Sequence, residues 1–184
     1  MIKALLRRRI AAFETGWGYD AGYMNDLLAL GPWTLIRFGL VASLGHSAAA
    51  PGAALAAARI VGTLSGDCGP CTQLTIDMAE KGGVRPEVLP AILVGDLAAM
   101  GETAALGYRF ARAALDRDLE TGDAARAEIT RRWGGKAVTA LGLALTTAQM
   151  YPTVKYSLGH GRTCSRVTVA GTPTPFSLAE PIAV

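Results

Sequence analysis

Apolar side chains recur every three to four residues along most of this 184-residue chain. That spacing places them on one face of an α-helix, so it predicts a series of amphipathic helices. The predicted helices cover residues 2–14, 20–30, 33–44, 51–64, 67–81, 86–97, 102–117, 123–133 and 135–150. Glycine and proline delimit several of them, as at Gly31-Pro32, and Pro152 is expected to kink or end the last helix.

The end of the chain has a different pattern. Residues 160–184 contain few regularly spaced apolar positions, and the triplet Val167-Thr168-Val169 is their one strand-like segment. We expect an irregular tail with a short strand. Strands and helices do not alternate along the chain, which disfavours a parallel α/β sheet. The sequence therefore predicts a single all-α domain over residues 1–184.

The composition fits such a helical domain. Hydrophobic residues make up 51% of the chain and aromatic residues only 7%, so alanine and aliphatic side chains dominate. Alanine has the highest helix propensity, and its small side chain favours closely packed helices. The helices carry more apolar stripes than one core of this size needs, so we expect a homo-oligomer. We interpret Trp17, Trp33 and Trp133 as core or interface residues.

Charge and hydropathy exclude several classes of function. The net charge of +3 is too small to indicate a nucleic-acid partner, and we interpret the basic residues Lys3 and Arg7 to Arg9 as a solvated helix face. No apolar stretch reaches the roughly 20 residues of a membrane span. Arg7-Arg8-Arg9 also interrupts the apolar region that a secretory signal would need. We therefore expect a cytoplasmic protein with no membrane and no nucleic-acid partner.

The sharpest chemical feature is the segment Asp67-Cys68-Gly69-Pro70-Cys71. Two cysteines with two residues between them, at the start of a helix, can form a disulfide with little change in the backbone. Asp67 or Ser65 can cap that helix, and Pro70 fits its first turn without loss of a helical hydrogen bond. The N–H groups of the first turn favour a thiolate at Cys68, so we expect a lowered pKa for that thiol. A thiolate beside a second thiol is what disulfide exchange requires.

Other interpretations of the pair stay open. It can be half of a zinc site, although Cys164, His46 and His160 lack the spacing of a second ligand pair. It can also be an inert pair of core residues. Gly-Pro also separates the two cysteines of thioredoxin, where the motif follows a strand. Here the motif follows residues 56–64, which have a helical period. We therefore interpret the match as convergence on the same local chemistry and not as a thioredoxin fold. Candidates for a carboxylate near the pair are Glu80, Asp96 and Glu102.

The order of helix, small-residue break, Cys-x-x-Cys and helix resembles the AhpD-like, carboxymuconolactone decarboxylase-like superfamily. The stretch from Ala58 to Cys71, continued to Val84, carries the resemblance, and two later helical stretches are also similar to the family. The similar region spans about 50–160, preceded by additional helices at 2–45 and followed by the tail at 160–184. The resemblance implies an AhpD-like helical bundle, usually oligomeric. It also implies alkylhydroperoxidase-like redox activity, which reduces peroxides or exchanges disulfides.

The redox members of that family use a proton relay that this chain lacks. Their relay consists of a glutamate twelve residues before the first cysteine and a histidine four residues after the second, and those positions here hold Ala56 and Thr75. Pro70 stands where a further histidine often precedes the second cysteine. Without the relay, efficient peroxidase activity is not expected. The family implies that Cys71 attacks, whereas the helix-terminus argument favours Cys68.

These observations predict a thiol–disulfide oxidoreductase or alkylhydroperoxidase-like antioxidant protein whose catalytic residues are Cys68 and Cys71. We expect it to act on a small thiol, disulfide or peroxide without a bound cofactor or metal, with slow peroxide turnover and measurable disulfide exchange. If Cys68 attacks, Cys68→Ser abolishes exchange and Cys71→Ser traps a mixed disulfide. The alternative hypothesis is a non-catalytic helical oligomer of the same fold.

Overall fold

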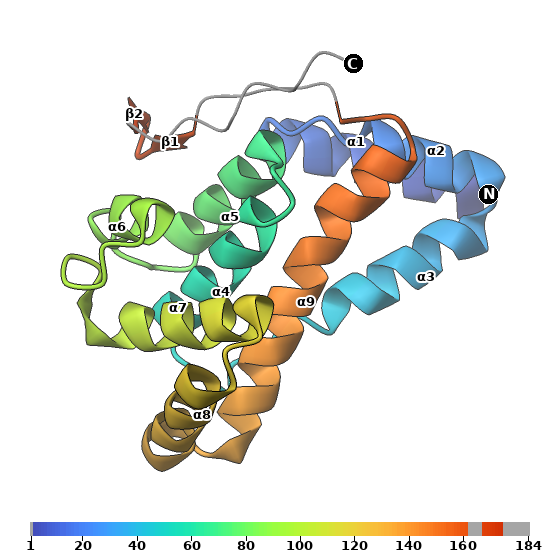
Figure 1. The fold of residues 1–184 in the computed structure, drawn as a ribbon. Helices are drawn as coiled ribbons and strands as arrows, with labels where there is room; N and C mark the ends of the chain where they lie inside the picture. Colours follow the sequence, from blue (N-terminus) through green and yellow to red (C-terminus); the bar gives the residue numbers. More distant parts are fainter. Residues whose placement is uncertain (1, 162–166, 175–184) are drawn as a thin grey trace, which may run out of the picture.

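The computed structural model describes residues 2–161 and 167–174, and these residues form an all-α protein (Figure 1). The predicted fold class is therefore confirmed. The helices are α1 (Ile2–Trp17), α2 (Gly22–Leu30), α3 (Pro32–Ser43), α4 (Gly52–Leu64), α5 (Gly69–Lys81), α6 (Val88–Val94), α7 (Gly101–Asp116), α8 (Leu119–Trp133) and α9 (Gly135–Ser157). The strands β1 (Thr168–Val169) and β2 (Thr172–Pro173) form a small antiparallel hairpin.

Helix α4 lies at the centre of the bundle and packs against α5, α6, α7 and α9 (Figure 1). Most of its residues are buried, and many of them are alanine. At Gly62 the contact with α9 leaves no room for a side chain: a Cβ added there would lie 2.7 Å from the Leu145 carbonyl oxygen and 2.8 Å from the Ala148 Cβ. Small residues thus let the two helix backbones approach closely, in agreement with the alanine-rich composition.

The N-terminal helices α1, α2 and α3 gather on one side of the core (Figure 1). They have an apolar cluster of their own, centred on Ile10, Tyr23 and Leu28. Leu74 of α5 and Val154 of α9 pack against this cluster. Because Leu74 lies one helical turn after Cys71, the N-terminal helices are held next to the cysteine pair.

Helix α3 is apolar, yet none of its residues is buried. Trp33 is 70% exposed and Leu40 is 63% exposed, so the predicted apolar stripe exists but faces solvent in the single chain. The neighbouring Leu30 and Leu44 are exposed as well. None of the helices within residues 2–161 is both long enough and apolar enough to cross a membrane.

Several predicted helix boundaries are wrong, and the reason is clear at three of them. Helix α9 continues through Pro152 to Ser157, because the proline ring is buried against Gly66 and tertiary packing outweighs the lost hydrogen bond. Helix α6 ends at Gly95 in the left-handed conformation, so Leu97 is exposed rather than directed inward. Helix α8 starts at Leu119 and not at residue 123, because the Asp118 carboxylate accepts the Thr121 N–H and caps it.

The expected short strand in the tail is confirmed by the β1–β2 hairpin, which lies against α5. The Gln73 side chain binds the backbone of Thr168 twice: Nε2 donates to the carbonyl oxygen at 3.0 Å, and Oε1 accepts the N–H at 2.7 Å. Val167 and Val169 are buried in the core next to this contact. Residues 167–174 are therefore fastened to the helix that begins at the cysteine pair, while the rest of the predicted irregular tail, 162–166 and 175–184, lies outside the described residues.

Candidate functional site

The cysteine pair lies at the start of α5, as the sequence predicts. Cys68 is the N-cap residue with an extended backbone, and Pro70 lies in the first turn. The two sulfurs form a disulfide, with 5.3 Å between the Cα atoms. No strand precedes the motif among the described residues, since α4 ends at Leu64 and a short turn follows. The predicted geometry of the pair is confirmed.

The capping group differs from the prediction. The Cys68 Sγ itself accepts the Cys71 N–H at 3.3 Å, so neither Asp67 nor Ser65 caps the helix. Asp67 is exposed and has a φ of 48°, in the left-handed region. Sulfur thus occupies the place where a helix terminus best stabilises negative charge.

The turn is anchored to α4 through two buried threonines. The Thr72 Oγ1 lies 3.0 Å from the Cys68 carbonyl oxygen and 3.2 Å from the Thr63 Oγ1. The Thr63 hydroxyl in turn donates to the Ile60 carbonyl oxygen at 3.0 Å. These contacts fix the first turn of α5 to the central helix, so the position of the disulfide is set by the core.

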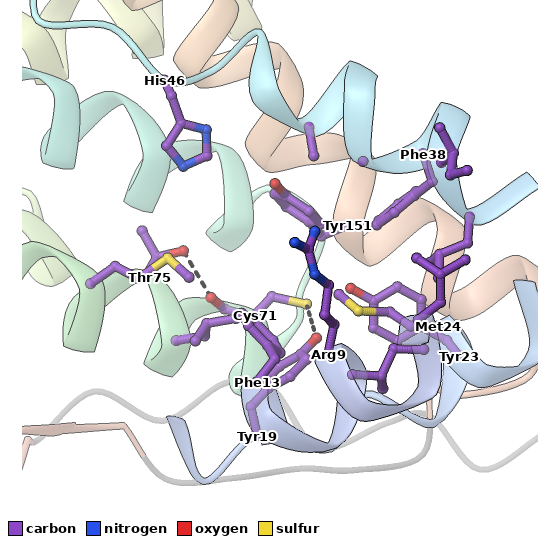
Figure 2. A pocket seen from close by; sticks show the side chains of 18 residues that line it. Arg9, Phe13, Tyr19, Tyr23, Met24, Phe38, His46, Cys71, Thr75 and Tyr151 are labelled. Atoms are coloured by element: carbon purple, nitrogen blue, oxygen red, sulfur yellow. Dashed lines mark hydrogen bonds between the residues drawn. The ribbon is translucent and has the colours of Figure 1, made fainter. Parts of the chain in front are cut away.

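A cavity of about 480 Å³ lies between the N-terminal helices and the core, and Cys71 is in its wall (Figure 2). Cys68 is not among the residues that line it. Most of the lining is apolar and comes from α1, α2, α3, α5 and α9. The lining residues are Leu6, Arg9, Ile10, Phe13, Tyr19, Tyr23, Met24, Leu35, Ile36, Phe38, Gly39, Ala42, His46, Cys71, Leu74, Thr75, Met78 and Tyr151.

Five aromatic rings follow one another around this cavity, and each contacts the next edge to face. The ring centroids are 5.9 Å apart between Phe13 and Tyr19 and 6.5 Å apart between Tyr19 and Tyr23. The series continues through Phe38 to Tyr151, with centroid distances of 5.8 and 5.9 Å. Edge-to-face pairs add to the stability of an apolar wall. The rings join α1, α2, α3 and α9 into one continuous lining.

The Tyr19 hydroxyl lies next to the Cys71 sulfur. Its hydroxyl oxygen lies 4.0 Å from the Cys71 Sγ, and because a disulfide sulfur carries no proton, the hydroxyl donates (Figure 2). Burial raises the pKa of Tyr19 to about 12, so the hydroxyl stays protonated at neutral pH. The buried Lys155 places its Nζ 4.8 Å from the centroid of the Tyr19 ring, and burial lowers the pKa of this lysine.

The three relay positions supply no general acid or base to the pair. Ala56 is buried in the core. Thr75 lines the cavity, but its hydroxyl donates to the Cys71 carbonyl oxygen at 2.9 Å. Pro70 has no titratable group. The proton donor near the sulfur is instead Tyr19, which comes from a different part of the chain.

Neither His46 nor His160 hydrogen-bonds the disulfide. His46 is exposed and lines the cavity, while His160 hydrogen-bonds Asp26, with 2.6 Å between Nε2 and Oδ2. Cys164 lies outside the described residues. Among residues 2–161 and 167–174, no three histidine, cysteine or acidic side chains are grouped so as to hold a metal ion.

The three candidate carboxylates have other partners. Glu80 accepts the Ala170 N–H at 2.7 Å, and Asp96 accepts the N–H groups of the turn that follows it. Glu102 pairs with Arg132. None of the three lines the cavity.

Sequence reasoning missed most of the residues around Cys71. Arg9 is exposed on α1 and Tyr19 lies in the loop after it, as the sequence predicts, but the sequence does not predict that both line one cavity with Tyr151. One signal was present: half of the chain's few aromatic residues lie between positions 13 and 38. Aromatic residues concentrated in an otherwise alanine-rich chain indicate a place where large side chains surround a space.

Comparisons with known proteins identified no match to this chain. No protein-family model matches the chain, and neither a curated protein nor a solved structure matches it.

Proposed function

We propose that this protein catalyses thiol–disulfide exchange, with Cys68 and Cys71 alternating between disulfide and dithiol. The observation that carries the proposal is the position of the Cys71 sulfur, in the wall of an apolar cavity and 4.0 Å from the Tyr19 hydroxyl. The neighbouring sulfur accepts a helix N-terminal N–H, which favours its thiolate. These observations support a role for the Cys71 sulfur in meeting the substrate and for the Cys68 sulfur in leaving or returning as an anion.

The geometry supports Cys71 as the cysteine that bonds to the substrate. An incoming thiolate attacks the Cys71 Sγ, the bond between Cys71 and Cys68 breaks, and Cys68 leaves as a thiolate stabilised by the Cys71 N–H. A second substrate thiolate attacks the sulfur of the bound substrate, and Cys71 leaves as a thiolate beside the Tyr19 hydroxyl. The products are a substrate disulfide and the protein dithiol, so two electrons pass from the substrate to the protein. The reverse sequence reduces a substrate disulfide.

The resemblance to the AhpD-like superfamily supports the same assignment, because the second cysteine of the motif is the attacking one there. Tyr19 differs from the family's relay, however. Its pKa of about 12 makes it a hydrogen-bond donor but a poor base at neutral pH, so it cannot deprotonate a thiol. We therefore propose that disulfide exchange is the principal activity and that peroxide turnover is slow.

A second candidate function is a non-catalytic helical oligomer of this fold. Two observations favour it: the relay positions hold Ala56, Pro70 and Thr75, and the apolar face of α3 is exposed. In that case the disulfide is a structural cross-link that stabilises the start of α5. The two functions differ in whether the pair exchanges with small thiols.

Single-cysteine variants test the proposed exchange. Both are made in a Cys164→Ser background, so that the third cysteine does not react. With a small aromatic disulfide, the reduced Cys68→Ser protein is expected to accumulate a mixed disulfide on Cys71, because the resolving sulfur is missing. Cys71→Ser is expected to lose exchange, because Cys68 does not line the cavity. Mass spectrometry of the intact protein measures both results.

The reverse result is loss of exchange in Cys68→Ser and a mixed disulfide in Cys71→Ser. It would mean that Cys68 attacks, as the helix-terminus argument predicts. If both variants exchange as fast as the protein with Cys68 and Cys71 intact, the redox function is wrong and the scaffold function replaces it. The Cys164→Ser protein is the control for both measurements.

A further inference from the structure

The cavity beside Cys71 combines apolar walls with one positively charged side chain. Its walls are aromatic and aliphatic, and Arg9 is the one side chain with a permanent charge among the described residues that line it. These lining residues include no aspartate or glutamate, and His46 is the only other basic side chain among them. A cavity of this composition complements a molecule with an apolar body and one negative charge.

Arg9 is available for such a ligand. It forms no hydrogen bond and no ion pair with any other residue in the described part of the chain. Figure 2 shows its side chain extending from α1 in the direction of Tyr151, across the space in which Cys71 lies. A guanidinium group binds a carboxylate through two parallel N–H donors, so an unpaired arginine at an apolar cavity favours a planar anion.

We propose that this cavity binds a single-chain amphiphile with a carboxylate head group, such as a medium- or long-chain fatty acid. The hydrocarbon chain lies among the rings of Phe13, Tyr23 and Phe38, and the carboxylate pairs with Arg9. The cavity volume of about 480 Å³ lies within the range of roughly 300–1,000 Å³ that is usual for small-molecule sites. Binding requires no redox chemistry, so this inference goes beyond the proposed exchange function.

The charge contribution is tested with two ligands and two arginine variants. Dodecanoate and dodecan-1-ol share a chain and differ in the charged head group. Arg9→Gln is expected to weaken dodecanoate binding about three- to tenfold, as for an exposed charge-assisted pair, and to leave dodecan-1-ol binding unchanged. Arg8→Gln removes the same charge from the neighbouring position, which does not line the cavity, and is expected to change neither. Titration calorimetry below the micelle-forming concentration measures all four affinities.

The apolar part of the site is tested by filling it. Gly39 lines the cavity, its φ is compatible with any residue, and an added Cβ there would meet no atom within 4 Å. Gly39→Leu is therefore expected to fold and to weaken both ligands at least tenfold. Gly142→Leu is the matched control, because Gly142 is also a helical glycine with open space but lies outside the cavity lining.

Three results would overturn the proposal. One is a lack of dodecanoate binding by the unmodified protein. Another is equal weakening by Arg9→Gln and Arg8→Gln, which indicates a diffuse basic surface. The third is binding to anionic phospholipid vesicles without binding of free dodecanoate, which indicates a membrane surface as the partner. Repeating the titration with the Cys68→Ser, Cys71→Ser double variant separates this proposal from disulfide exchange, since binding is expected to persist.

Discussion

At the scale of single residues, Tyr19 is the side chain that most directly affects Cys71. Its hydroxyl donates toward the Cys71 sulfur from 4.0 Å, and its pKa of about 12 keeps it protonated across the range in which a thiol titrates. Tyr19→Phe removes this donor without changing the ring. Since one hydrogen bond contributes about 1 kcal/mol and one pKa unit corresponds to about 1.4 kcal/mol, we expect the pKa of the reduced Cys71 thiol to rise by roughly 0.5–1 unit.

The pH dependence of alkylation by iodoacetamide measures this pKa in the reduced Cys68→Ser, Cys164→Ser protein. A raised thiol pKa means that less thiolate is present at neutral pH, so the variant reacts more slowly there and reaches the same rate at high pH. Tyr108→Phe is the control, because that tyrosine does not line the cavity. Identical alkylation profiles for Tyr19→Phe and its parent would remove Tyr19 from the site.

At the scale of helices, the contact between α4 and α9 depends on a glycine. The 2.7 Å approach of a Cβ at Gly62 to the Leu145 carbonyl oxygen involves backbone, which cannot move aside as the end of a long side chain can. Gly62→Ala is therefore expected to destabilise the protein by about 1–3 kcal/mol through overpacking. Gly142→Ala in α9 meets no atom within 4 Å and is expected to stabilise it by roughly 0.5–1 kcal/mol through helix propensity.

Urea denaturation followed by circular dichroism measures both free energies of unfolding. The two variants make the same chemical change in a helix, so their difference isolates the close contact. A loss of stability of equal size in both would show that the α4–α9 approach tolerates an added methyl group.

At the scale of the whole molecule, the exposed apolar residues of α3 are where we expect copies of the chain to meet. One side of this helix lines the cavity through Leu35, Phe38 and Ala42, while Trp33 and Leu40 are exposed. Contiguous exposed apolar side chains are typical of an interaction surface. We therefore expect a homo-oligomer in which the outer side of α3 is buried between copies.

Light scattering coupled to size exclusion measures the mass in solution, which is expected to be a multiple of the monomer mass. The double variant Trp33→Glu, Leu40→Glu is expected to be monomeric, because it introduces charges into the apolar surface. Leu119→Glu is the control, since Leu119 is equally exposed but lies at the start of α8. A monomeric unmodified protein at micromolar concentration would contradict the prediction.

Features that depend on neighbours in sequence were determined by the sequence alone. The helices follow from apolar spacing, and the disulfide at the start of α5 follows from two cysteines around Gly-Pro. The helix ends were less predictable where distant contacts decide them. Pro152 continues a helix because it packs on Gly66, which lies far away in the sequence, in the turn between α4 and α5.

Only the tertiary structure decided what surrounds Cys71. The cavity is formed by α1, α2 and α3 from one end of the chain, α5 from the middle and α9 from the other end. No spacing rule connects Arg9, Tyr19 and Tyr151, because helical periodicity specifies which face of a helix is apolar but not which helix it meets. The sequence by itself therefore determined the all-α class and the close cysteine pair at the start of a helix, and packing decided which hydroxyl, charge and apolar wall surround Cys71.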